Sequence, residues 1–212
     1  MLQRSMLITF LAPLALCAAS MPNPAVDEQP VRKTETAVFA GGCFWGVEAA
    51  LEGLKGVTNA VSGYSGGSKA NADYDLVSTG TTGHAESVQV TFDPSQITYG
   101  QLLKVFFSFH DPTELNRQGP DSGTQYRSAL FYSGEEQKRI AEAYIQQLTA
   151  AKAYSKPIVT KVTPLQAFYP AEEHHQDFIK RNPRQAYVVQ EDLPKLAKLR
   201  KDFPTMLKEN KK

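Results

Sequence analysis

The run GGCFWG, from Gly41 to Gly46, holds the most reactive side chain that this sequence offers for chemistry, the thiol of Cys43. Cys43 follows a Gly-Gly break, and from Phe44 onward apolar residues recur at the spacing of a helix. The thiol is therefore expected at a helix N-terminus, where free N–H groups and a partial positive charge favour the thiolate. This position favours a reactive nucleophile, although a small buried structural cysteine remains the alternative.

Glu86 is the second candidate, in the stretch HAESVQVTF from His84 to Phe92, which reads as a strand. Alternation places Glu86 on the same face as Val88 and Val90, which is the face expected to be buried. A buried carboxyl without a cationic partner has a raised pKa and can donate a proton at neutral pH. The alternative is that the strand begins beyond the core, which would leave Glu86 solvated at its rim.

Other cysteine chemistries find less support in the sequence. A thioredoxin-type Cys-x-x-Cys pair would need a second cysteine at Gly46, and a tyrosine-phosphatase loop would need an arginine at Ala49. No metal site is expected, because zinc requires several cysteines or histidines at short spacing. A cysteine hydrolase with His84, His110 or His175 as its base remains open.

The N-terminus is expected to direct the protein out of the cytoplasm. Residues 1–20 have a basic start, an apolar run from Met6 to Cys17 and small residues after it, as in a secretory signal peptide. The motif LALC also approaches a bacterial lipoprotein signal, in which Cys17 would carry the lipid. We expect a periplasmic or secreted protein, with membrane attachment only if Cys17 is lipidated. In either case Cys43 is left as the one free thiol, which excludes a structural disulfide.

The elements that position these residues alternate along the chain. Strands are expected at 34–40, 57–64, 84–92, 127–132 and 158–163. Helices are expected from Cys43, from Thr98, from a capping box at 133–136 to about Ala151, and from Pro170 to about Lys180. This order predicts an α/β (α+β) two-layer sandwich with helices packed on a mixed sheet.

The length and composition of the chain are consistent with one folded domain. The chain has 212 residues, of which 42% are apolar, and a net charge of +1. We expect a proline-rich linker at 21–33, a catalytic domain at 34–185 and a charged, partly helical surface tail at 186–212. The small net charge gives no reason to expect a nucleic-acid partner, and we expect a monomer.

Five motifs in order resemble the peptide methionine sulfoxide reductases of the A class, which act on the S epimer of methionine sulfoxide. They are GGCFWG, GYSGG at 63–67, TGHAESVQV at 82–90, HDP from His110 and GTQYRSA at 123–129. The match runs from about Thr34 to Pro183. The resemblance implies a ferredoxin-like plait, that is, a split β-α-β sandwich with added helices.

The resemblance also assigns roles to eight residues. Those with catalytic roles are Cys43, Glu86, Tyr74, Tyr126 and Asp121; those expected to bind substrate are Phe44, Trp45 and His175. The cysteine attacks the sulfoxide sulfur while the acid and the two tyrosine hydroxyls stabilise the oxygen. The aspartate positions water or substrate, the two aromatic residues receive the methyl group, and the histidine lies near the site.

The resemblance implies reduction of free or protein-bound methionine sulfoxide, as protein repair under oxidative stress, without a metal or other cofactor. The product on Cys43 is a sulfenic acid. Many family members resolve it with cysteines near the C-terminus, but the tail here has none. We therefore expect an external thiol reductant, a thioredoxin-like or glutaredoxin-like protein or a small thiol. A protein that only binds methionine-rich surfaces through Phe44 and Trp45 is a further alternative.

Overall fold

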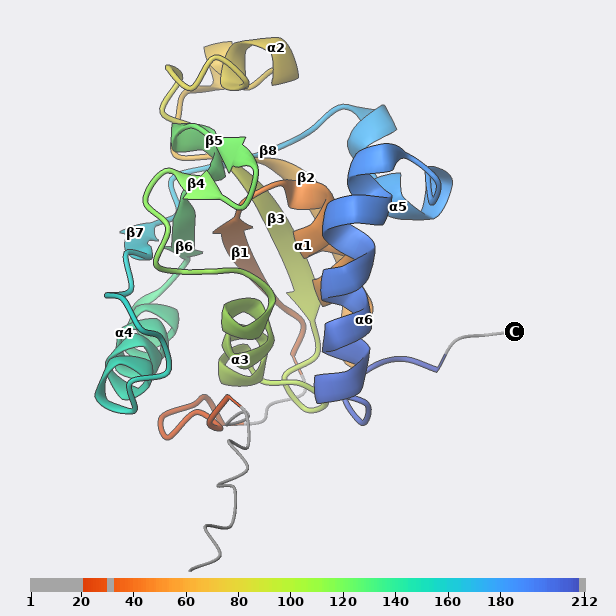
Figure 1. Cartoon of the computed structure of the whole chain (residues 1–212). Coiled ribbons are helices and arrows are strands. Elements are labelled where there is room, and N and C mark those ends of the chain that lie inside the picture. Colours follow the sequence, from red (N-terminus) through yellow and green to blue (C-terminus); the bar gives the residue numbers. More distant parts are fainter. Residues whose placement is uncertain (1–20, 30–32, 210–212) are drawn as a thin grey trace, which may run out of the picture.

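The computed structural model describes residues 21–29 and 33–209, so the predicted signal peptide and Cys17 lie outside the described residues. The described part contains a central sheet, a small two-stranded sheet and several helices (Figure 1). The strands are β1 (Glu35–Gly41), β2 (Val57–Ser65), β3 (Ala85–Phe92), β4 (Arg117–Gln118), β5 (Asp121–Ser122), β6 (Ser128–Tyr132), β7 (Lys161–Pro164) and β8 (Phe168–Pro170). The α-helices are α1 (Phe44–Glu52), α2 (Tyr74–Val77), α3 (Tyr99–Phe109), α4 (Glu135–Ala150), α5 (Phe178–Arg181) and α6 (Leu193–Asp202). The 3-10 turns are η1 (Lys69–Asn71), η2 (Thr124–Tyr126) and η3 (Glu173–His175), and η4 (Val188–Asp192) is a π-helical turn.

The strand order of the central sheet is β7-β6-β1-β3-β2-β8. Strand β3 lies between β1 and β2 and is antiparallel to both, and β1 lies between β3 and β6. The units β1-α1-β2 and β3-α3-β6 are therefore both split β-α-β units, which is the ferredoxin-like arrangement. Strand β7 adds a parallel edge and β8 an antiparallel one, so the sheet is mixed as predicted.

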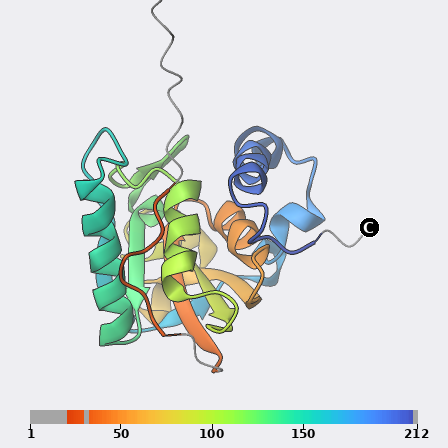
Figure 2. The same ribbon diagram turned by 90° about the horizontal axis from the view of Figure 1, so that it is seen from below.

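The main core lies between one face of the sheet and the helices α1, α3, α4 and α6 (Figures 1 and 2). Alternate strand residues such as Phe39, Val88 and Leu130 point into it. Val38 and Phe131 belong to a smaller cluster on the other face, against which Leu165 and Phe168 pack. The molecule is thus a two-layer sandwich, and Glu86 belongs to the strand face that the helices cover.

One predicted helix cap and one predicted helix start are wrong, although α4 itself begins within the predicted segment 133–136. Helix α4 begins after Gly134 without a side-chain cap, because Ser133 gives its N–H and hydroxyl to Gln137 Oε1 instead of forming the expected capping box. Pro170 ends β8 on the edge of β2, where a missing N–H is tolerated, and so it cannot open a helix. The 3-10 turn η3 and the short helix α5 follow instead.

The segment predicted as a linker lies against the domain over its described residues 21–29 (Figure 2). Asp27 accepts hydrogen bonds from Gly100 N (2.9 Å) and the Thr98 hydroxyl, and Glu28 accepts one from Tyr99 N (2.6 Å). Two acidic side chains thereby satisfy free N–H groups at the N-terminus of α3, where negative charge is favourable.

The C-terminal segment is partly helical, as the sequence predicts, but its apolar side is buried. Val188, Leu196, Leu199 and Phe203 join the main core, and α6 packs beside α1 and α3. The charged residues that made the segment resemble a surface tail occupy the outer face of an amphipathic helix. Within residues 21–29 and 33–209 we find no helix with the length and apolar character needed to cross a membrane.

Candidate active site

Cys43 occupies the turn between β1 and α1, as the Gly-Gly break predicts. Gly42 has φ +95°, a backbone conformation that favours glycine, and a Cβ there would lie 2.5 Å from Gln118 Cγ. Cys43 then serves as the N-cap residue of α1 and is half-buried. The thiol therefore stands at the end of the helix where the first-turn N–H groups are free.

The expectation of a thiol ionised by the helix N-terminus is wrong for the free protein. Burial raises the pKa of the Cys43 thiol well above its usual range, and the nearby carboxyls of Glu86 and Asp192 raise it further. A hydrogen bond from the backbone N–H of Trp45 opposes these effects but does not outweigh them. The resting cysteine is therefore protonated, and its attack on a substrate requires a proton acceptor.

Glu86 is buried rather than solvated at the rim, which decides between the two alternatives. Its side chain is 2% exposed, and its Oε2 atom accepts a hydrogen bond of 3.1 Å from Phe44 N in the first turn of α1. Burial raises the pKa of Glu86 to about 8, with a smaller contribution from Asp121. At pH 7 the carboxyl is mostly neutral and can donate a proton.

The predicted tyrosines and Asp121 come from separate elements and meet at the same place. Tyr74 begins α2, Tyr126 ends η2, and Asp121 begins β5. The charges that act on Tyr126 come from Glu86, Asp121, Cys43 and Tyr74, so the five predicted catalytic side chains form one cluster. Burial raises the pKa of both tyrosines, which keeps their hydroxyls protonated as hydrogen-bond donors.

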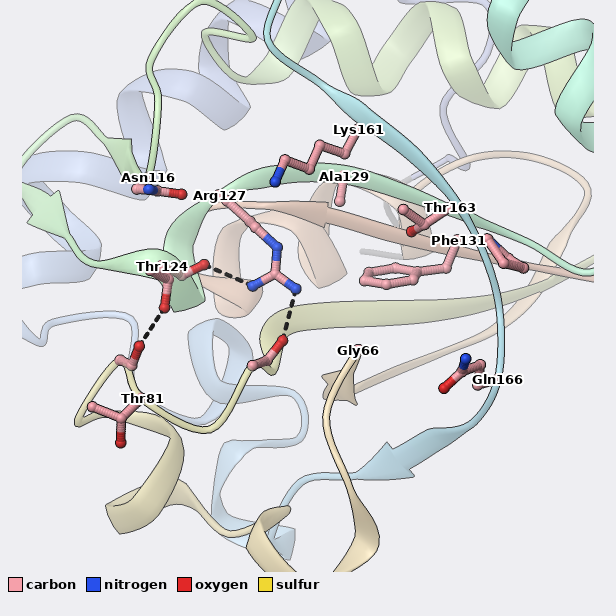
Figure 3. A pocket seen from close by; sticks show the side chains of 13 residues that line it. Gly66, Thr81, Asn116, Thr124, Arg127, Ala129, Phe131, Lys161, Thr163 and Gln166 are labelled. Carbon is pink, nitrogen blue, oxygen red and sulfur yellow. Dashed lines mark hydrogen bonds between the residues drawn. The ribbon is translucent and has the colours of Figure 1, made fainter.

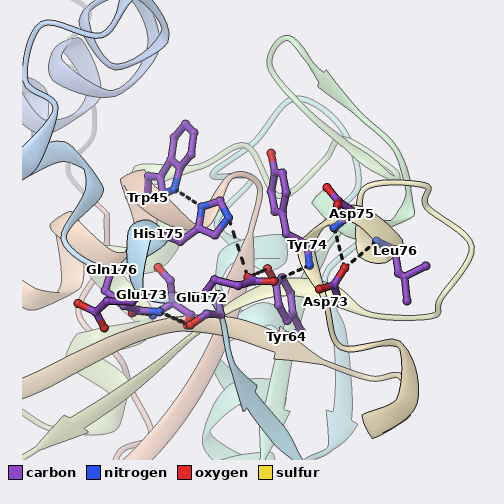
Figure 4. A network of polar contacts seen from close by, with 12 residues as sticks. Trp45, Tyr64, Asp73, Tyr74, Asp75, Leu76, Glu172, Glu173, His175 and Gln176 are labelled. Carbon is purple, nitrogen blue, oxygen red and sulfur yellow. Dashed lines mark hydrogen bonds and ion pairs between the residues drawn. The ribbon is translucent and has the colours of Figure 1, made fainter.

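Trp45 provides an accessible aromatic wall, whereas Phe44 belongs to the core behind it. The Trp45 ring stacks on Phe178 with centroids 3.6 Å apart and planes 6° apart. Its Nε1 donates a 3.2 Å hydrogen bond to His175 Nδ1 (Figure 4). Phe44 is only 1% exposed, so it can line the site from inside but presents little surface to a substrate.

His175 and Glu172 form the polar support behind this wall (Figure 4). Glu172 Oε2 accepts a 2.8 Å hydrogen bond from the Tyr64 hydroxyl, and Oε1 accepts one of 2.9 Å from Tyr74 N. His175 Nε2 lies 4.0 Å from Glu172 Oε2, and desolvation lowers the pKa of the imidazole. A neutral His175 that accepts from Trp45 acts to orient the indole. No pattern in the sequence indicated a role for Glu172 or Tyr64.

Two further residues reach the cluster from the C-terminal segment and were not predicted. The Tyr187 hydroxyl donates to Asp121 Oδ2, and the buried Asp192 is one of the carboxyls that raise the pKa of Cys43. The prediction of a charged surface tail hid both residues, because Asp192 resembles an ordinary residue before a helix. What distinguishes Asp192 is its position in the turn η4, where Val188 is buried as well.

His84 and His110, two of the three candidate bases, are engaged elsewhere, and His175 accepts from Trp45 Nε1, which disfavours a cysteine hydrolase. His84 Nδ1 accepts from Gly67 N (3.2 Å), and its Nε2 lies 3.0 Å from Ser68 O. His110 contacts Phe106 O and Ser128 Oγ, each at 2.8 Å. In residues 21–29 and 33–209 no three metal-ligating side chains are grouped for a metal ion.

A cavity of about 620 Å³ lies away from this cluster, on the face of the sheet that carries Ala129 and Phe131 (Figure 3). Arg127 lines it, but its guanidinium already donates to the carbonyls of Gly83, His84 and Thr124. None of the eight predicted site residues lines the cavity. This cavity is therefore separate from the predicted catalytic residues.

Known proteins match this chain over most of its length. A family model described as peptide methionine sulfoxide reductase matches residues 35–207. The curated peptide methionine sulfoxide reductase MsrA 2 of Mesorhizobium japonicum is 56% identical over 185 residues, which cover 87% of this chain and 95% of the relative. The protein of the same description from Synechocystis is 54% identical over 193 residues, which cover 89% and 90%.

Solved structures give the same fold. The reduced form of Mxr1 from Saccharomyces cerevisiae has a TM-score of 0.67 and 33% identity, covering 78% of this chain and 94% of that one. Methionine sulfoxide reductase A of Corynebacterium diphtheriae has a TM-score of 0.63 and 35% identity, covering 77% and 87%.

Proposed function

The chain belongs to the peptide methionine sulfoxide reductases, which are thiol-dependent oxidoreductases, and we propose that it reduces the S epimer of methionine sulfoxide through a sulfenic acid on Cys43. The substrate is the free amino acid or an oxidised methionine in a protein. Removal of the oxygen restores methionine, so the activity repairs oxidised proteins.

The first half of the reaction follows from the two groups at the start of α1. The Cys43 thiolate forms a bond to the sulfoxide sulfur while Glu86 delivers its proton to the oxygen. The sulfur–oxygen bond of the substrate breaks and the hydroxyl is transferred to the Cys43 sulfur. The bond between the two sulfurs breaks at the same time, so methionine leaves and Cys43 becomes a sulfenic acid. The sulfoxide is reduced by two electrons and the cysteine is oxidised by two. Tyr74 and Tyr126 stabilise negative charge that develops on the oxygen.

One observation carries this proposal. The hydrogen bond from Phe44 N to Glu86 Oε2 holds a neutral carboxyl next to the residue that supplies the thiol. A sulfoxide oxygen is a poor leaving group until it is protonated, so a thiol alone would not suffice. A nucleophile and a proton donor in one half-buried place provide both requirements of this reaction.

The test uses S- and R-methionine sulfoxide with dithiothreitol. We expect turnover of the S epimer, no turnover in Cys43→Ser, and a rate roughly 100-fold lower in Glu86→Gln, as expected for loss of a general acid. Glu52→Gln at the end of α1, where Glu52 pairs with Lys180, is the matched control and should keep the wild-type rate. Retained function in Cys43→Ser would favour the methionine-binding alternative, and acyl-enzyme formation without a reductant would favour a hydrolase.

The reductant is proposed to be an external thiol. No cysteine follows Cys43 in the sequence, and α6 occupies the C-terminal segment in which many relatives carry a resolving cysteine. The sulfenic acid is then discharged by a thioredoxin-like or glutaredoxin-like protein, or by a small thiol, through a mixed disulfide. Protein oxidised with substrate and mixed with a thioredoxin that retains one reactive cysteine should be trapped at Cys43. An intramolecular disulfide to Cys17 would contradict this cycle.

We further propose that the protein acts outside the cytoplasm as a monomer. Support comes from the signal-like residues 1–20, which lie outside the described part of the chain. Fractionation of cells that express the full chain should recover a processed form in the periplasm or medium. Labelling with a palmitate analogue, compared between wild type and Cys17→Ser, distinguishes a lipid anchor from simple cleavage. Full-length protein in the cytoplasm would contradict export.

A further inference from the structure

Asp192 is a buried carboxyl with one oxygen that lacks a hydrogen-bond partner. It is 2% exposed, and its Oδ2 atom has no hydrogen-bond partner among the described residues. The other buried carboxyls differ, since Glu86 accepts from Phe44 N and Glu48 accepts from the Ser62 hydroxyl. Burying an unsatisfied carboxyl is costly, so its presence points to a role other than stability.

The two ordinary structural roles of such a residue do not apply. Asp192 directly precedes α6, but its side chain makes no capping hydrogen bond, because the π-helical turn η4 leads into α6 and occupies the N–H groups. Lys195 lowers the pKa of Asp192, yet no ion pair within 4.0 Å joins them in the described chain. Single π-helical turns are frequent at functional sites.

The carboxyl of Asp192 lies against the first turn of α1, the turn that Cys43 begins. Its Oδ1 atom is only 2.5 Å from the position that a Cβ on Gly46 would take, so only a glycine allows this approach. Asp192 is also among the charged groups that act directly on the Cys43 thiol and the Tyr187 hydroxyl. It therefore lies beside the turn that begins at Cys43, on a different element from Glu86, which belongs to β3.

The proposed reaction needs two proton transfers of opposite direction at the same moment. The substrate oxygen must receive a proton from Glu86, while the Cys43 thiol must lose one. Glu86 already holds a proton and cannot accept another. From this geometry, and resting on the proposed function, we propose that Asp192 is the proton acceptor for the Cys43 thiol and later returns that proton to it.

The proton and electron balance closes over one cycle. In the first half, Asp192 takes the thiol proton and Glu86 gives its own to the oxygen, which leaves Asp192 neutral, Glu86 ionised and Cys43 as sulfenic acid. Two reductant thiols then supply two electrons and two protons. One of these protons restores Glu86, and the other completes the water formed from the sulfenic oxygen. When the second thiol displaces Cys43 from the mixed disulfide, Asp192 returns its proton to the leaving thiolate.

The pH dependence of the first half follows from the groups that face Asp192. Desolvation raises the pKa of Asp192 to about 7; Lys195 opposes this effect, and Asp121 and Glu191 add to it. The productive form has Asp192 ionised and Glu86 neutral. The rate of methionine formation in a single turnover should therefore rise through about pH 7 and fall through about pH 8.

The experiment measures methionine formed in a single turnover, without reductant, alongside the rate at which iodoacetamide alkylates Cys43. In Asp192→Asn the single-turnover rate at pH 7 should fall roughly 100-fold. Alkylation should become faster, because the carboxyl no longer raises the pKa of the thiol. The rate of methionine formation in this variant should recover at high pH, where the thiol ionises unaided. Asp202→Asn on the exposed side of α6, where Asp202 pairs with Lys198, is the matched control.

These opposite changes separate a proton acceptor from a residue that acts only through charge or packing. If Asp192→Asn forms methionine at the wild-type rate or faster, the proposal is overturned. Asp192→Glu, which keeps a carboxyl, should restore part of the rate. If the Asn variant does not fold, the pH dependence of the wild-type single-turnover rate tests the proposal. A rate that rises with pH in parallel with Cys43 alkylation, and not with a midpoint near pH 7, overturns it. Wild type that forms no methionine would refute the proposed function instead.

Discussion

Burial raises the pKa of both reacting groups near the start of α1, but the consequences for the reaction are opposite. It raises the pKa of Glu86 to about 8, which keeps the acid neutral and ready to donate. It also raises the pKa of Cys43, which makes the nucleophile harder to form. The site therefore depends on groups that accept the thiol proton and not only on the helix N-terminus. Residue identity and spacing indicate which side chains are present, but desolvation depends on what covers them.

The first prediction is that Glu86 stops donating its proton at alkaline pH. Because Glu86 donates only while protonated, the single-turnover rate should decline as the pH rises through about 8, the raised pKa of this carboxyl. The measurement is the rate of methionine formation between pH 6 and 10. The residual rate of Glu86→Gln should lack this decline. A wild-type rate that stays constant from pH 7 to 10 would show that another group protonates the oxygen.

Individual elements differ in how well the sequence predicts them. The alternation in β3 and the N-cap residue Thr98 are local signals, and both predict their elements correctly. Pro170 and the C-terminal segment fail because their conformations are decided by distant partners, the edge of β2 and the surface of α1. The residues missed in the site, Tyr187 and Asp192, lie in such a segment. Motif resemblance located the five-residue cluster, whereas local patterns alone indicated only Cys43 and Glu86.

The short helix α2 gives the second prediction, because it holds Tyr74 but spans only four residues. Glu172 ties its first N–H to the Tyr64 hydroxyl of β2 (Figure 4). A glutamine offers one acceptor oxygen instead of two, so Glu172→Gln should release α2 or Tyr64. We expect kcat to fall about tenfold, equivalent to about 1.4 kcal/mol, with little change in KM or Tm.

The exposed neighbour Glu173, which pairs with Arg181, provides the control for this prediction. Glu173→Gln has the same chemical change one residue along the chain but contacts no part of α2. Steady-state kinetics and thermal unfolding of both variants test the idea. Equal kcat values in the two variants would mean that Glu172 does not position Tyr74.

The raised pKa values in the site also affect the stability of the whole fold. Glu86 and Asp192 stay protonated in the folded protein up to about pH 8 and 7, while their ordinary values are 4.5 and 3.8. Between these limits the unfolded chain has released protons that the folded protein still binds. The contribution of each group to the free energy of unfolding is therefore fully present below its ordinary pKa. It is lost as the pH rises toward its raised pKa.

The third prediction follows from this linkage. Glu86→Gln keeps a neutral side chain of the same shape at every pH, so it avoids the cost that wild type incurs as the pH rises. The free energy of unfolding of the variant, relative to wild type, should increase between pH 5 and 8, by at most about 1.4 kcal/mol per pH unit for one proton. Urea unfolding at several pH values measures it, and Glu142→Gln on the exposed side of α4 should show no such trend. A relative stability that is constant or decreases with pH would mean that Glu86 ionises normally in the fold, and the proton donor assigned to this site would be lost with it.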